Sequence, residues 1–414
     1  MKTVATLVLN CLFMVLFTGC AGHGPFRPKA EACPVGTSPA SDCSAYSVEQ
    51  RPDFSVAYVE LTDQGLFHRR DQLEEALKLV SDTADRMPTQ VVVFVHGWKH
   101  SAQASDPDVI SFTNDVMPLM KAQSPQAATV GIFVGWRGAS MAVGKNLTFY
   151  DRKSSADHVA RGSLRELLAN LRAIRARDPA KYNRVKVVVV GHSFGGLILF
   201  NAIAGATMDG LVQAGYEPAA NTAASPIYDI AVLLNPAFEA TRFEPLFQAA
   251  KRREKTPKRD PWPPGQHPLL ISITSEGDWA TKIAFPLGRV VNSVFQKESW
   301  IDQDEAENIP EWSRERVEKQ ANTHTVGHLA RYRTHVLTLA GSGASSRAQC
   351  TPIENKFVDQ SNNFPLWNMY AARDVSADHG DIYGRPLWEF IARVASATDS
   401  RQPICEAAVL PALP

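Results

Sequence analysis

The chain has 414 residues, of which 44% are hydrophobic and 21% are charged, so it is long and apolar enough to bury a sizeable core. Lys and Arg number 43 and Asp and Glu also number 43, so no overall charge directs the protein to nucleic acid or another polyanion. We therefore expect one large domain with insertions and no nucleic-acid partner.

The amino terminus has the pattern of a secretory signal peptide. Lys2 precedes a largely apolar run, Val4 to Phe17, that is too short for a comfortable membrane span. The run ends in Phe17-Thr18-Gly19-Cys20, which resembles the lipobox of bacterial lipoproteins. This resemblance implies a lipidated Cys20 as the first mature residue, anchored on the periplasmic side of the outer membrane. Secretion to the periplasm with an unmodified Cys20 is the alternative.

Cysteine usage fits an oxidising compartment. Besides Cys11 in the signal and Cys20, an even number of four cysteines remains: Cys33, Cys43, Cys350 and Cys405. Pairing of Cys33 with Cys43 and of Cys350 with Cys405 is plausible, but the sequence leaves three connectivities open. No C-x-x-C or paired Cys/His spacing is present, so we expect no metal site.

The composition changes along the chain predict four parts. Residues 1–19 are the signal peptide, and residues 20–52, rich in Ala, Pro, Ser and Gly, are expected to be a flexible tether. The folded domain is expected over 53–398, and 399–414 form a tail.

Within the domain, apolar runs alternate with amphipathic stretches. Strands are predicted near 55–61, 90–95, 129–134, 187–190, 227–234, 269–274, 334–340 and 366–371, and helices near 71–81, 109–120, 156–177, 197–208 and 385–396. This alternation predicts an α/β fold with a doubly wound, mostly parallel sheet.

Two insertions interrupt the alternation. Residues 251–268 are basic and then proline-rich, which favours a surface loop over a contact with a membrane surface or polyanion. Residues 285–331 contain Trp300 and Trp312 and are equally consistent with a lid over a pocket and with a plain surface excursion.

A G-x-S-x-G motif lies between a buried strand and a helix. The β-branched run Val187 to Val190 precedes Gly191-His192-Ser193-Phe194-Gly195, and an apolar helix start follows. The glycines permit a tight turn that exposes the hydroxyl of Ser193, so we expect Ser193 to be a nucleophile. These residues resemble the nucleophile elbow of the α/β-hydrolase superfamily, with His192 and Phe194 flanking the serine as in many of its esterases and lipases.

That resemblance implies an acid and then a histidine later in the chain. Asp278, in the loop after the strand near 269–274, is the expected acid, and Glu276 is the alternative. A helix cap before Trp279 is the structural alternative for either carboxylate.

Four histidines follow Asp278 in the chain. His379, in the turn-rich sequence Asp378-His379-Gly380-Asp381 between the last strand and the last helix, is the expected base. His335 lies within a strand pattern and is interpreted as structural. His324 and His328 are interpreted as surface or lid residues, since the glutamate of a zinc-protease motif is absent between them.

An oxyanion hole requires backbone N–H donors near the serine. Phe194, which follows the nucleophile, is expected to supply one donor. His96-Gly97-Trp98 resembles the oxyanion turn of the superfamily, with the Trp98 amide as the second donor and His96 as a structural residue. Trp136 and His192 are expected to contact substrate, with core packing as the alternative for Trp136.

The sequence thus predicts a lipid-anchored serine hydrolase that cleaves carboxylic esters, of the esterase or lipase type, without metal or organic cofactor. Its expected partners are a small-molecule or lipid ester and the membrane that holds the lipid anchor. Thioesterase, amidase and peptidase activities are alternatives. So is an α/β-hydrolase scaffold that binds lipid or protein in the cell envelope with little turnover.

Overall fold

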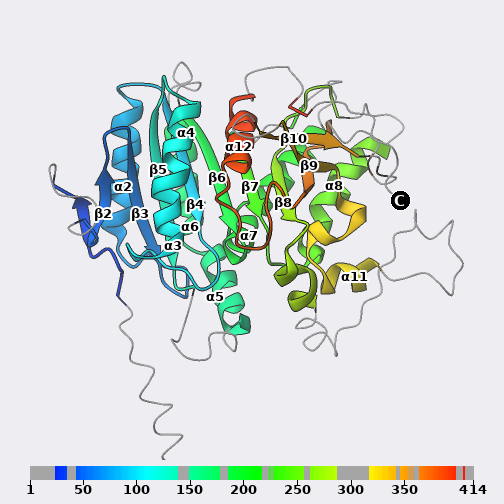
Figure 1. Cartoon of the computed structure of the whole chain (residues 1–414), viewed down its shortest axis with the longest axis horizontal. Coiled ribbons are helices and arrows are strands. Elements are labelled where there is room, and N and C mark those ends of the chain that lie inside the picture. Colours follow the sequence, from blue (N-terminus) through cyan, green and yellow to red (C-terminus); the bar gives the residue numbers. More distant parts are fainter. Residues whose placement is uncertain are drawn as a thin grey trace, which may run out of the picture.

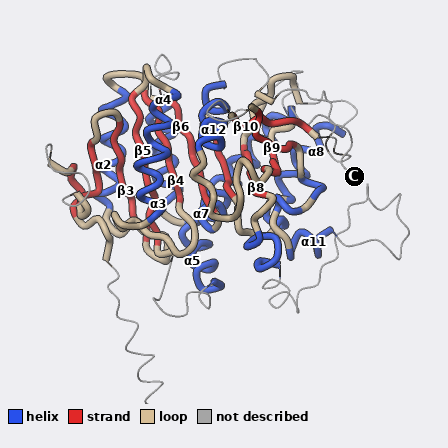
Figure 2. Tube along the Cα trace, in the orientation of Figure 1, coloured by secondary structure: helices blue, strands red, loops and turns tan. Residues whose placement is uncertain are grey.

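The computed structural model describes residues 24–34, 43–138, 149–177, 185–216, 223–224, 227–255, 262–286, 317–341, 346–353, 355, 358, 363–397 and 404–405. These residues form one eleven-stranded sheet with helices on both faces (Figure 1). Its strand order is β1-β2-β3-β5-β4-β6-β7-β8-β11-β9-β10. Figure 2 shows the strands as a continuous central layer between the helices. The predicted α/β fold is confirmed.

The strands are β1 (Lys29–Ala32), β2 (Tyr46–Gln50), β3 (Phe54–Leu61), β4 (Thr89–Val95), β5 (Ala128–Trp136), β6 (Val185–His192), β7 (Ile230–Leu234), β8 (Leu270–Ser275), β9 (His335–Ala340), β10 (Arg347–Pro352) and β11 (Leu366–Ala371). All neighbouring strands are parallel in the central part of the sheet, β3-β5-β4-β6-β7-β8-β11-β9. Strand β2 runs antiparallel to β3, and β10 runs antiparallel to β9. The parallel strands therefore end at one common edge of the sheet.

The helices are α2 (Arg70–Ala84), α3 (Pro107–Ser111), η1 (Phe112–Val116), α4 (Met117–Gln123), α5 (Phe149–Arg161), α6 (Leu164–Ala176), α7 (Phe194–Tyr216), η4 (Ala240–Arg242), α8 (Glu244–Lys255), η5 (Ala280–Ala284), α11 (Val317–Thr323), η7 (Val326–His328), η8 (Ala330–Tyr332) and α12 (Arg385–Ala397). Residues of α2, α6 and α7 pack in one hydrophobic core, and residues of α3, η1, α4 and α12 in another.

Strand β4 shows why the central strands are continuous apolar runs. Val91 and Val93 point into one core, while Val92 and Phe94 point into the other. Successive side chains of a strand alternate between the two faces, so a strand covered on both faces needs apolar residues at every position.

The prediction of a flexible tether over residues 20–52 is wrong for part of this range. Strands β1 and β2 pair with each other and β2 joins β3, so residues 29–32 and 46–50 contribute to the sheet. The backbone N–H groups of Phe26 and Arg27 both donate to the Glu60 carboxylate at 2.8 Å. Strands of four and five residues have too few positions to show a period. Among the described residues, contacts with the sheet are made from Phe26 onward, and the predicted signal peptide and Cys20 lie outside the described residues.

Two other boundaries differ from the predicted ones. The single helix expected at 156–177 is broken between α5 and α6, because Gly162 abuts Gly65, whose carbonyl oxygen would lie 2.2 Å from an added Cβ. The basic residues at the start of the first insertion complete helix α8 instead of forming a loop, and Lys251 and Arg253 are buried. Residues 256–261 lie outside the described residues.

Helix α7 is long and apolar enough to cross a membrane by length and composition. Half of its most apolar window is buried inside the protein, and it contacts β6, α5 and α8. It is therefore the core helix that follows the central strand.

The structure contains the disulfides Cys33–Cys43 and Cys350–Cys405, the pairing that the sequence left as one of three. The second closes a separation of 55 residues and ties residue 405 to β10. Each disulfide lowers the conformational entropy of the unfolded chain. This effect stabilises the folded state by about 4 kcal/mol for Cys350–Cys405 and by about 3 kcal/mol for Cys33–Cys43, which are ten residues apart.

We therefore expect Cys350→Ser/Cys405→Ser to lower the free energy of unfolding by roughly 2–4 kcal/mol, measured by urea denaturation. Cys33→Ser/Cys43→Ser serves as the control and should cost less. An unchanged urea midpoint in the first variant would contradict the expectation.

Candidate active site

Ser193 lies on a strained turn at the end of β6. Its φ angle is +54°, a left-handed conformation that is uncommon for a non-glycine residue, and its N–H donates to the Leu234 carbonyl at 2.9 Å. A Cβ added to Gly195 would lie 2.0 Å from the Val95 carbonyl oxygen, so the start of α7 packs directly on β4. Glycine is therefore required at this point of the predicted elbow, and the turn presents the Ser193 hydroxyl.

Three loops bring the predicted acid, base and nucleophile together. The Ser193 Oγ lies 2.9 Å from Nε2 of His379, and Nδ1 of His379 lies 2.9 Å from Oδ1 of Asp278. With a neutral histidine that carries its proton on Nδ1, the serine hydroxyl donates to His379 and His379 donates to Asp278. The structure therefore joins the three side chains in one hydrogen-bonded series.

Asp278 is fully buried and remains charged. Burial by itself raises the pKa of this carboxyl, but the hydrogen bond from His379 and the two donors of Thr281 hold the pKa below its usual value. The Thr281 N–H donates to Oδ1 at 3.0 Å, so Asp278 also caps η5. Glu276, the alternative acid, is exposed, and no described hydrogen bond joins its side chain to His379.

Asn235 joins the loops that carry the acid and the base. Its Nδ2 donates to the carbonyl oxygens of Asp378 and His379 at 3.2 and 3.1 Å, and its Oδ1 accepts from the Ser275 N–H at 2.8 Å. Asn235 has a φ angle of +44° at the end of β7. The sequence marks it only as an asparagine after a strand, and its role was missed because both partners are distant in the chain.

His192, the residue before the nucleophile, is as buried as Ser193, each at 5% exposure. Its side chain is buried, and its Nε2–H donates to the carbonyl oxygen of His379 at 2.8 Å. Burial, together with the neighbouring His379, lowers the pKa of His192 to about 3, so the ring is neutral. His192 therefore holds the backbone of the loop that carries His379.

Trp136 is also buried, which favours the core-packing alternative. Its ring stacks on His96 with centroids 5.7 Å apart, and its Nε1–H donates to the His96 carbonyl at 2.8 Å. The Trp136 backbone N–H donates to Nε2 of His96 at 3.0 Å, so the proton of His96 lies on Nδ1 and is donated to the Gly97 carbonyl. Burial lowers the pKa of His96 to about 4, which keeps this arrangement neutral.

The predicted oxyanion turn lies against the nucleophile. A Cβ added to Gly97 would be 3.0 Å from Cβ of Ser193 and 2.9 Å from Nδ1 of His192. Trp98 follows in the same turn, and its ring lies 6.5 Å from that of Phe194. The amides of Phe194 and Trp98 remain the predicted oxyanion donors.

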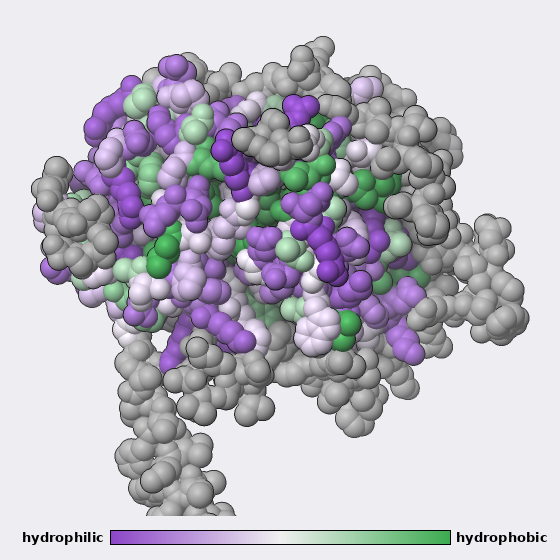
Figure 3. Space-filling view, viewed as in Figure 1, coloured by the Kyte–Doolittle hydropathy of each residue, from purple (hydrophilic) through white to green (hydrophobic). Residues whose placement is uncertain are grey.

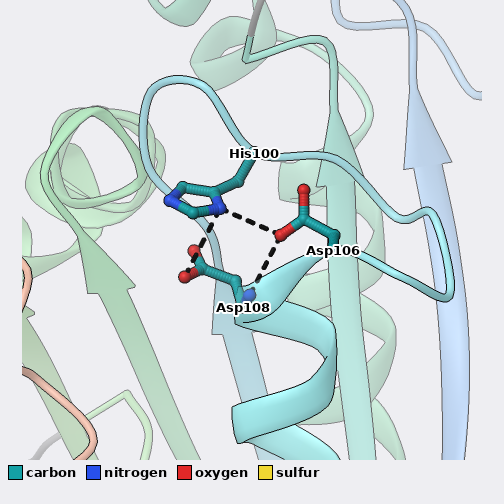
Figure 4. Close-up of side chains that lie close together, drawn as sticks. All are labelled: His100, Asp106 and Asp108. Carbon is teal, nitrogen blue, oxygen red and sulfur yellow. Dashed lines mark hydrogen bonds and ion pairs between the residues drawn. The ribbon is translucent and has the colours of Figure 1, made fainter.

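Three side chains beyond this turn carry atoms that could ligate a metal ion. The ligand atoms of His100, Asp106 and Asp108 lie within 4.8 Å of one another, and Figure 4 shows the imidazole between the two carboxylates. Nδ1 of His100 lies 2.9 Å from Asp106 and 3.5 Å from Asp108. Despite burial, these carboxylates raise the pKa of His100, so the cluster is an ion pair that ties the turn to the start of α3.

The other histidines differ in their surroundings. His335 is buried and packs against Trp367 with the two rings tilted and their centroids 4.4 Å apart, as expected for a structural residue. His324 contacts the Gln320 carbonyl at the end of α11. His328 is half-buried, and its Nε2 lies 2.9 Å from Oγ1 of Thr281. The tryptophans of the second insertion lie outside the described residues.

The buried neutral histidines predict acid sensitivity. An unfolded histidine binds a proton near pH 6.5, whereas burial lowers the pKa of His96 and His328 to about 4 and that of His192 to about 3. Stability is therefore full above pH 6.5 and is lost as the pH falls toward 4. Asp108 and His100 oppose this trend, because the pKa of Asp108 is raised to about 6 by burial and the pKa of His100 is also raised.

We expect the free energy of unfolding to fall by roughly 2–4 kcal/mol between pH 7 and pH 5, measured by urea denaturation at constant ionic strength. Equal or greater stability at pH 5 would contradict the neutral state of these rings.

Comparison with known proteins gives a family and a fold. Residues 92–343, more than half of the chain, match the model of the alpha/beta hydrolase family. Phospholipase PlaB from Legionella pneumophila, in complex with thio-NAD, is similar at 14% identity and a TM-score of 0.31, over 75% of this chain and 60% of PlaB. Siderophore hydrolase EstB from Aspergillus nidulans is similar at 12% identity and a TM-score of 0.30, over 74% of this chain and 82% of EstB.

No curated protein matches the sequence. The chain spans about 60% of the length of PlaB. The sheet order, the elbow and the match over residues 92–343 agree with one another. The chain belongs to the alpha/beta hydrolase family.

Proposed function

We propose that the protein is a serine hydrolase that cleaves carboxylic esters through an acyl-enzyme. The observation that carries this proposal is the continuous hydrogen-bonded series Ser193–His379–Asp278. Asp278 keeps the proton of His379 on Nδ1, which leaves the Nε2 lone pair directed at the serine hydroxyl. Asp278, His379 and Ser193 are then acid, base and nucleophile in the proposed triad.

In the first step, Ser193 Oγ attacks the ester carbonyl carbon while its proton passes to Nε2 of His379. Collapse of the tetrahedral intermediate breaks the bond to the alcohol oxygen, which leaves with that proton. A water then attacks the acyl-enzyme, with His379 as base, and releases the acid. The amides of Phe194 and Trp98 are the proposed oxyanion donors.

Apolar side chains beside the acid loop support an ester with an apolar part. Trp279 and Ile283 are 62% and 41% exposed, and both lie within six residues of Asp278. Figure 3 shows hydrophobic residues interspersed with hydrophilic ones on one face of the molecule. Large exposed apolar side chains are expected where a protein meets an apolar ligand or surface.

We further propose lipidation at Cys20 and a place in the cell envelope. Since the fold begins near Phe26, a span of about 20 Å at full extension would separate the lipid from the folded body. The protein would then work close to the membrane surface. Mass spectrometry of the mature amino terminus tests this, and an unmodified Cys20 would contradict it.

A fluorophosphonate probe tests the enzymatic activity. The wild-type protein is expected to form one adduct at Ser193, located by peptide mass spectrometry, and Ser193→Ala to form none. Hydrolysis of p-nitrophenyl esters of increasing acyl length then measures the chain-length preference. A folded wild-type protein that is not labelled at Ser193 would contradict the proposal and favour a binding scaffold.

A further inference from the structure

Thr281 supplies two of the hydrogen bonds that hold the buried carboxylate of Asp278. Its backbone N–H donates to Oδ1 at 3.0 Å, and its hydroxyl donates to Oδ2. Oδ1 also accepts the proton of Nδ1 of His379 at 2.9 Å. Because Asp278 is 0% exposed, water does not replace these donors, and the carboxylate depends on Thr281 for its orientation.

The Thr281 hydroxyl has a second partner, His328. Nε2 of His328 lies 2.9 Å from Oγ1 of Thr281. The hydroxyl has one proton, which it donates to Asp278, so the contact with His328 requires an N–H donor on the histidine. His328 is therefore protonated on Nε2. Burial lowers its pKa to about 4, so the ring is neutral at physiological pH.

The turn that carries His328 is firmly placed at the carboxyl edge of the sheet. Asn368, in β11, donates from Nδ2 to the carbonyl oxygen of Val326 at 3.0 Å, and Arg333 donates to the Gly327 carbonyl at 3.1 Å. A Cβ added to Gly327 would lie 1.9 Å from Oγ1 of Thr274 in β8. The donor of His328 is therefore held in a fixed position relative to Thr281.

We propose that Thr281 and His328 are positioning residues of the triad, which hold the Asp278 carboxylate in the orientation that receives His379. This proposal rests on the proposed serine hydrolase activity. His328 orients the Thr281 hydroxyl, the hydroxyl orients the carboxylate, and neither residue touches the reacting atoms. The effect of His328 passes entirely through the hydroxyl, since a hydrogen-bonded series transmits orientation from one member to the next.

Four single variants and one double variant test the order of this series. Thr281→Val removes the hydroxyl at nearly constant shape, and Thr281→Ser restores it. His328→Leu removes the donor, and His328→Gln places an amide N–H near the same position. Thr281→Val/His328→Leu removes both. His324→Leu, which alters a histidine four residues earlier without contact to Asp278, is the matched control.

The rate of fluorophosphonate labelling and the kcat and KM for p-nitrophenyl butyrate are measured for each variant, together with its melting temperature. We expect roughly a 10- to 100-fold lower kcat for Thr281→Val and roughly a 2- to 10-fold lower kcat for His328→Leu, with KM unchanged. Thr281→Ser and His328→Gln should recover most of the rate. The double variant should match Thr281→Val alone, because the histidine has no hydroxyl left to orient.

If Ser193 is labelled in the wild-type protein, either of two results would overturn the proposal. One is a wild-type kcat in His328→Leu, and the other is additive losses of kcat in the double variant. Equal losses in His328→Leu and His328→Gln that follow the melting temperature would assign His328 to stability alone and also overturn it. Lack of labelling in the wild-type protein would instead overturn the serine hydrolase proposal and, with it, the roles of Thr281 and His328.

Discussion

Ser193→Ala is expected to lower kcat for a short p-nitrophenyl ester by roughly 10⁴- to 10⁶-fold without changing the melting temperature. The substitution removes one Oγ, and with it the atom that would bond to the acyl group. His379→Ala should cause a loss of similar size, since Nε2 of His379, 2.9 Å from that oxygen, is the only described base that contacts it. The double variant should be no slower than either single variant, because the proposed nucleophile and base act as one unit.

The acid has a matched control in the same loop. Asp278→Asn is expected to lower kcat by roughly 10⁴-fold, because an amide in place of the carboxylate no longer holds the proton of His379 on Nδ1. Glu276→Gln should leave kcat within about twofold, since Glu276 is exposed. The reverse result would assign the acid to Glu276, and retained activity in His379→Ala would exclude His379 as the base.

Gly195→Ala is expected to have the largest effect on folding. The added Cβ would lie 2.0 Å from the Val95 carbonyl oxygen and 2.5 Å from that of His96, both backbone atoms of the strand end that carries the oxyanion turn. Neither atom belongs to a flexible side chain, so α7 would have to move away from β4. We expect a loss of roughly 3 kcal/mol or more in the free energy of unfolding, or failure to express in soluble form.

Gly205→Ala is the control in the same helix. A Cβ at Gly205 meets nothing within 4 Å, so alanine should stabilise α7 by roughly 0.5–1 kcal/mol through its higher helix propensity. The two variants are compared by urea denaturation. Equal stability of both would show that the close approach of α7 to β4 is not required.

Much of the fold was predictable because it depends on local patterns. The β-branched run before Ser193 marks a strand buried on both faces, and the glycines mark a turn that only small residues permit. Strands β1 and β2 were missed because each is too short to show a period, and their stability comes from pairing and from the buried Arg27–Glu49 ion pair at 2.7 Å. The break between α5 and α6 was missed because it results from contact with a distant glycine.

The candidate site also has features that the sequence predicts and features that only the folded structure shows. Residue type and chain order were enough to select Ser193 and His379 and to favour Asp278 over Glu276 as the acid, and the structure places Ser193, His379 and Asp278 within hydrogen-bonding distance. The surroundings of these residues were not predictable, since Asn235 and Thr281 act on the site through loops that meet only in the folded protein. The burial of His192 and Trp136 was not predictable for the same reason, because it depends on the packing around a side chain.

The sequence by itself therefore determined the α/β fold, the nucleophile turn and the order of the candidate triad, because strand burial and turn geometry depend on residues that are close together in the sequence. Only the tertiary structure decided which carboxylate faces His379, how the cysteines pair and that the sheet begins near residue 29. These features depend on contacts between residues that are far apart in the chain. Such contacts form only when the helices and loops pack on both faces of the sheet.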